Sequence, residues 1–120
     1  MISADWCRLM ARYNAWQNAQ VTEYVLALPG EEVTRERGAF FGSILRTLSH
    51  VYWGDWIWMS RFDGGSAPAN ATSPQGGLPE TTDLFPTAAT WSADRFRMDG
   101  RIRLWAKDLN DVDLLGDLTW

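Results

Sequence analysis

The sequence predicts an all-α fold, a helical bundle formed by a single domain. In three long stretches, residues 4–28, 44–62 and 87–110, large apolar residues recur every three or four positions, which is the spacing of one helix face. Ser3 and Ser43 precede the first two stretches, and serine is a favoured residue for capping the start of a helix. With 120 residues the chain can bury one core and is too short to suggest two domains.

The first helix is predicted for residues 4–28. Its large apolar residues, which share one face, are Trp6, Leu9, Met10, Tyr13, Trp16, Val21, Tyr24, Val25 and Leu28. Ser3 is its expected N-cap, and Pro29-Gly30 is a stop signal. The charged stretch 31–38 lacks an apolar rhythm, so we expect a connection with one helical turn.

The second helix, predicted for residues 44–62, bears most directly on function. At 100° per residue, one broad stripe forms the expected core face: Ile44, Leu48, Val51, Tyr52, Trp58, Met59 and Phe62. Asp55 falls within this stripe, so its carboxylate needs hydrogen-bond partners or an opposite charge. His50 lies on the opposite arc with Trp53 and Ile57 among polar residues. This mixed arc indicates a pocket or a contact face.

The last third of the chain begins with a predicted loop. Residues 64–86 are rich in Gly, Ser, Pro, Asn and Thr, a composition typical of a long surface loop. The third helix is predicted to begin near Thr87 and to end around Asn110. After it, residues 118–120 are expected to begin a short strand or hairpin.

Composition excludes several classes of function. A net charge of −4 and a pI near 4.8 argue against a nucleic-acid-binding surface. The single cysteine, Cys7, cannot form an internal disulfide, and no apolar run is long enough to span a bilayer. We therefore expect a cytoplasmic protein with neither nucleic-acid nor membrane partners. Eight tryptophans indicate a heavily packed interior, an interface or a pocket wall.

His50 is the one candidate for metal chemistry that the residues themselves offer. Histidine binds transition metals well and titrates near neutral pH, and the chain contains only this one. A single histidine on a mixed helix face is more often a hydrogen-bonded packing residue than a ligand. The residues alone leave both interpretations open.

Three segments together resemble the DinB family, also called the DinB/YfiT-like metalloenzymes. They are residues 13–18 (Tyr-Asn-Ala-Trp-Gln-Asn), residues 37–62 around Thr-Leu-Ser-His-Val-Tyr-Trp-Gly-Asp, and residues 104–120. The family's histidine and the aspartate that follows it fall on His50 and Asp55. The resemblance follows the whole chain in order.

The resemblance implies a four-helix bundle with a long crossover connection. It also implies a divalent metal (Zn, Ni, Mn or Fe) held by one histidine of helix two and two histidines of helix four. His50 matches the first ligand, and no second histidine follows. We therefore expect residues 1–120 to form one DinB-like domain that has the first three helices and lacks the C-terminal one. A site with one histidine is expected to hold the metal weakly or not at all.

Two functions are expected as alternatives: the resemblance implies the first, and the mixed arc of the second helix together with the tryptophans indicates the second. In the first, the full-length protein is a metal-dependent S-transferase or hydrolase that acts on a small-molecule thiol; His50 is a metal ligand, Trp53 and Ile57 line the pocket, and Asp55 is a buried structural carboxylate. In the second, the chain is a non-catalytic dimerisation or interaction module without metal, and the tryptophans form its interface. A homodimer is expected in either case.

Overall fold

The computed structural model describes residues 1–69 and 78–120, and these residues form helices and connecting segments. The helices are α1 (Ala4–Ala27), α2 (Gly30–Thr34), α3 (Ile44–Asp63), α4 (Leu78–Thr82), α5 (Ala88–Asp108) and the 3₁₀ helix η1 (Asp111–Leu114). Within the described ranges no strand is present, and the one isolated β-bridge joins Ala39 to Gly42. The predicted all-α fold with three long helices is confirmed.

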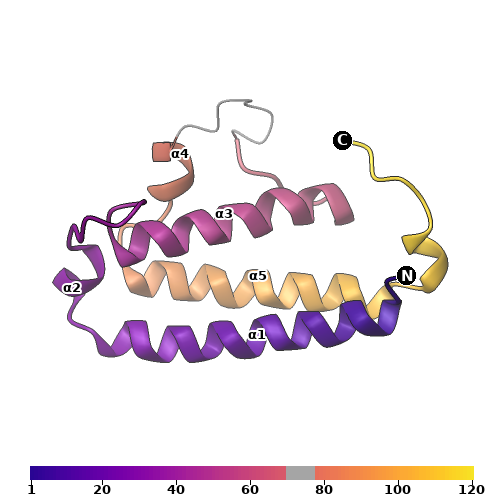
Figure 1. Ribbon diagram of the computed structural model, residues 1–120, viewed down its shortest axis with the longest axis horizontal. Helices are drawn as coiled ribbons and strands as arrows, with labels where there is room; N and C mark the ends of the chain where they lie inside the picture. The colour runs from indigo at the N-terminus through magenta and orange to yellow at the C-terminus, as the bar shows by residue number, and fades with distance from the viewer. Residues whose placement is uncertain (70–77) are drawn as a thin grey trace.

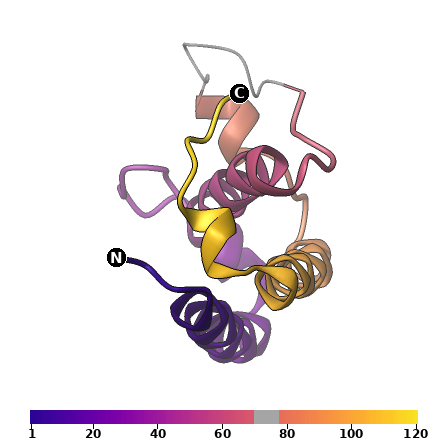
Figure 2. The same cartoon turned by 90° about the vertical axis from the view of Figure 1, so that its right-hand side faces the viewer.

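The three long helices form an open, triangular bundle. α5 lies between α1 and α3 in the side view (Figure 1) and packs against both of them. Seen along the helices, α1, α3 and α5 occupy three corners (Figure 2). The short helices α2 and α4 pack against α3. None of the described helices combines the length and apolarity needed to cross a bilayer.

The predicted capping residues set the ends of the long helices. The Ser3 side chain accepts a hydrogen bond from the Trp6 backbone N–H at 3.1 Å, and Ser43 accepts one from Arg46 at the same distance. These bonds satisfy backbone donors that the first turn of a helix leaves unpaired. At the end of α3, Gly64 adopts the left-handed conformation with φ of 68°, which glycine enters without a steric penalty.

The buried core is divided into two clusters. Val25, Val33, Leu45 and Trp91 join α1, α2, α3 and α5 at one end of the bundle. Tyr52 and Met59 of α3 pack with Met98 of α5 further along.

The predicted core stripe of the second helix is only partly buried. Tyr52 and Met59 are buried, whereas Val51, Trp58 and Phe62 remain 53%, 45% and 43% exposed. The prediction was wrong for these three residues because no described helix covers that side of α3. The helical periodicity identified an apolar face correctly, but it could not show whether a neighbour buries it.

Two expectations for the connecting segments were wrong. The predicted loop 64–86 contains the five-residue helix α4, in which Thr81 and Thr82 are each 1% exposed. So short a helix has no apolar repeat for a sequence pattern to reveal. Residues 118–120 form no strand and follow η1 as irregular chain. The rest of the predicted loop, residues 70–77, lies outside the described residues.

Candidate functional site

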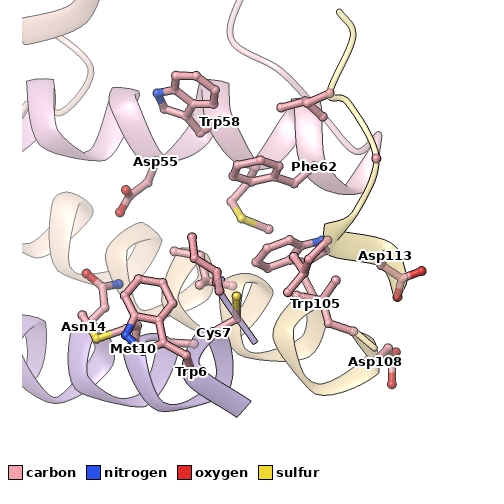
Figure 3. Close-up of a pocket in the computed structure, with 18 of the residues that line it drawn as sticks. Trp6, Cys7, Met10, Asn14, Asp55, Trp58, Phe62, Trp105, Asp108 and Asp113 are labelled. Carbon is pink, nitrogen blue, oxygen red and sulfur yellow. The ribbon is translucent and has the colours of Figure 1, made fainter. Parts of the chain in front are cut away.

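An open groove of about 840 Å³ runs between α1 and α3, and α5 forms its floor. Figure 3 shows this groove from the side, with side chains of all three helices turned toward it. Its lining includes Trp6 and Met10 from α1, Trp58 and Phe62 from α3, and Trp105 from α5. Apolar side chains that would normally be buried therefore face an open space.

Two of the polar residues that line the groove come from α1 and α3. Asn14 of α1 and Asp55 of α3 both line it, and in Figure 3 their side chains extend into the space between the two helices. Asp55 Oδ2 accepts a hydrogen bond from Arg95 Nη2 at 2.5 Å. The Asp55 side chain nevertheless keeps 34% of its surface exposed, whereas Arg95 keeps 3%.

Behind the groove, these residues belong to a polar cluster that joins all three long helices. The cluster consists of Asn14, Asn18, Asp55, Arg95 and Asp99. Asp99 Oδ1 accepts bonds from Arg95 Nε at 3.1 Å, from Arg95 Nη2 at 2.7 Å and from the amides of Asn14 and Asn18 at 3.2 and 3.0 Å. Burial raises the pKa of the Asp99 carboxyl above its ordinary value, and the Arg95 charge partly offsets this effect.

Arg95 thus supplies the hydrogen bond and the opposite charge that Asp55 was expected to need. The interactions of Arg95, Asp99, Asn14 and Asn18 were not predicted from the sequence. Arg95 and Asp99 are four positions apart, as are Asn14 and Asn18, and this spacing places each pair on one helix face. This spacing could have indicated that each pair acts together, but the same spacing is common between residues on solvated helix faces.

His50 lies on another side of α3, away from the groove. Its Nδ1 atom is 3.0 Å from the Thr81 hydroxyl of α4. Its ring stacks on Phe41, with ring centroids 4.3 Å apart, and on Trp53, with centroids 6.0 Å apart. His50 therefore connects α3 to α4 and to the segment that precedes α3.

The other residues predicted to surround a metal are placed as follows. Trp53 is beside His50, as its stacking shows, and Ile57 is buried with 6% of its surface exposed. Neither residue lines the α1–α3 groove, and their predicted role in a pocket around His50 stays a prediction. Over residues 1–69 and 78–120, no three His, Cys, Asp or Glu side chains gather in a way that could hold a metal ion.

The fold and this site define a helical-bundle protein with a buried polar cluster and one open apolar groove. A family model described as the DinB family matches residues 1–111. The chain therefore belongs to the DinB family, as the resemblance indicated.

One relative is similar to about half of the chain. Protein DinB of Bacillus subtilis (strain 168) is 36% identical over 61 residues, which cover 51% of this chain and 36% of that protein. The matched region of this chain thus spans about a third of the relative's length. No solved structure matches the chain significantly.

Proposed function

We propose that this chain is a helix-docking module of the DinB fold and that its α1–α3 groove binds an amphipathic helix. The observation that carries this proposal is the exposure of large apolar side chains along the groove. Trp6 is 49% exposed, and Trp58 and Phe62 are exposed to a similar degree. Scattered apolar residues are normal on a protein surface, but a contiguous apolar groove is typical of an interaction site.

The dimensions of the groove fit one helix. The lining runs from Trp6 to Asn14 on α1 and from Asp55 to Phe62 on α3, so the groove contacts about two turns of a docked helix, roughly 12 Å of its length. The family resemblance implies a fourth helix, which is an occupant of this kind. The homodimer expected from the sequence is another way to cover the groove, and the experiment below distinguishes it.

The test uses a labelled synthetic helix of about 20 residues with leucine along one face and alanine and glutamine elsewhere. We expect the wild-type chain to bind it, and Trp58→Glu to weaken binding by about tenfold or more, because a carboxylate replaces an indole that the docked helix would cover. Phe96→Glu is the matched control, since Phe96 is a 72% exposed aromatic residue that does not line the groove.

Sedimentation of the same three proteins identifies the occupant. A wild-type dimer that Trp58→Glu converts to a monomer supports a second copy as the occupant of the groove. A monomer that binds no peptide, or equal behaviour of the two variants, would overturn the proposal.

A second candidate function, divalent-metal binding, is favoured by the contact between His50 and Thr81. When Nδ1 donates its proton to the Thr81 hydroxyl at 3.0 Å, the lone pair of Nε2 is free for a metal. Metal-binding histidines usually donate the other ring N–H in this way. A bound Zn, Ni, Mn or Fe ion would supply Lewis-acid activation of a thiol or water, the chemistry of a transferase or hydrolase.

The described residues do not build that centre by themselves. His50 is the one histidine of the chain, and a three-histidine site with an open position needs two more ligands. Equilibrium dialysis against each of the four metals tests this candidate. Stoichiometric metal that His50→Ala abolishes and Thr81→Val weakens supports it. If the wild-type chain retains no metal, this candidate fails, and helix docking is unaffected.

A further inference from the structure

We propose that Asp55 selects the occupant of the groove, which is a helix that presents a lysine or arginine to Asp55 among apolar residues. This inference rests on the proposed helix docking. Two features support it: the polar cluster behind the groove contains more negative than positive charge, and the rest of the lining is acidic as well.

The imbalance lies between Asp55, Arg95 and Asp99. One guanidinium group contacts both carboxylates, Asp55 at 2.5 Å and Asp99 at 2.7 Å. Asn14 and Asn18 also donate to Asp99, but amides carry no charge. The cluster is therefore short of one positive charge when both carboxyls are ionised.

The lining of the groove does not supply the missing charge. The described residues around it include four aspartates and neither lysine nor arginine. They are Asp55, Asp108, Asp113 and Asp117. All described charged side chains that line the groove are thus acidic, which favours a cationic occupant over a neutral or acidic one.

Desolvation makes the selection specific to Asp55. About a third of its side chain, 34%, is exposed to solvent in the open groove. A docked helix removes this water, and an ionised carboxylate that loses water without a new partner is costly. A lysine or arginine on the helix replaces the water with a charge-assisted hydrogen bond.

The same charges argue against a symmetric second copy as the occupant. Two grooves placed face to face bring two sets of four aspartates together, and like charges across an interface repel. A basic amphipathic helix meets no such repulsion.

Three versions of the leucine-faced peptide described above test the inference. They differ at one central apolar-face position, which is lysine, norleucine or glutamate, and each is scanned over successive turns to sample the register. On the wild-type chain we expect the best lysine peptide to bind about tenfold tighter than the norleucine peptide and tighter still than the glutamate peptide. This comparison requires no variant of the protein.

Two variants then locate the selecting residue. Asp55→Asn should abolish the preference for lysine over norleucine, whereas Asp117→Asn should retain it, because Asp117 lies in the irregular chain after η1. Equal effects of the two substitutions would show a general acidic field and overturn the role of Asp55. Equal binding of all three peptides to the wild-type chain would overturn the inference and leave helix docking intact. If none binds, docking itself fails.

Discussion

Replacement of Arg95 by methionine should destabilise the bundle more than any other single change in the polar cluster. Arg95 is 3% exposed and donates three hydrogen bonds to two carboxylates. Methionine fills a similar volume but leaves the 6% exposed Asp99 without its positive partner. Breaking a buried ion pair from one side costs about 3–5 kcal/mol, and a domain is stable by about 5–15 kcal/mol in total. The variant should therefore be close to unfolding at room temperature.

The assay is urea denaturation followed by tryptophan fluorescence and circular dichroism. Arg95→Met combined with Asp99→Asn should recover part of the loss, because the unpaired buried charge is then gone. The loss should also shrink as pH falls toward the ordinary carboxyl pKa of 3.8. The sign follows because Arg95 lowers the pKa of Asp99 against the effect of burial. Without Arg95 the Asp99 pKa rises further in the folded variant, so the variant gains more stability than the wild-type chain as pH falls. A loss below about 1 kcal/mol, or a double variant no more stable than Arg95→Met, would refute the reasoning.

Three further predictions concern the ends of α3. Asp63→Asn should cost about 1 kcal/mol near neutral pH, because two hydrogen bonds from Arg101 at 2.7 Å lower the pKa of Asp63 below 3.8. This stabilisation is present above pH 3.8 and disappears as pH falls through the lowered pKa, so acid titration of both proteins should bring their stabilities together. Ser43→Ala should cost about 1 kcal/mol in urea melts through loss of the bond to the Arg46 N–H, whereas Ser43→Asp should retain stability. Gly64→Ala should cost about 1 kcal/mol because φ is 68° there, and a Gly64→Asn variant should lose less.

The ends of the long helices were predictable because single residues determine them. Ser3 and Ser43 cap α1 and α3 through bonds to the backbone N–H groups three positions ahead, which is local chemistry that a sequence shows directly. α4 was not predictable in this way. Its position depends on the burial of Thr81 and Thr82 against α3, a tertiary effect that is not visible in five residues.

The sequence predicted one feature of the candidate site, the need of Asp55 for a partner, and did not predict the rest. The need of Asp55 for a charged partner followed from its place on an apolar stripe, and the structure supplies Arg95 from a helix 40 positions away. No spacing rule connects two residues on different helices. The groove could not be predicted for a similar reason. Helical periodicity shows that Trp58 belongs to an apolar face, but it does not show which element covers that face.

α3 is the element on which the two proposed functions can be separated. His50 and Asp55 are five positions apart, so they point about 140° away from each other on the helix. The His50 side is held by Thr81 and Phe41, whereas the Asp55 side faces the open groove. Substitutions on one side should therefore leave the other function unchanged. Metal binding that responds to His50→Ala alone, together with a preference for the lysine peptide that responds to Asp55→Asn alone, would show that one helix serves two independent roles.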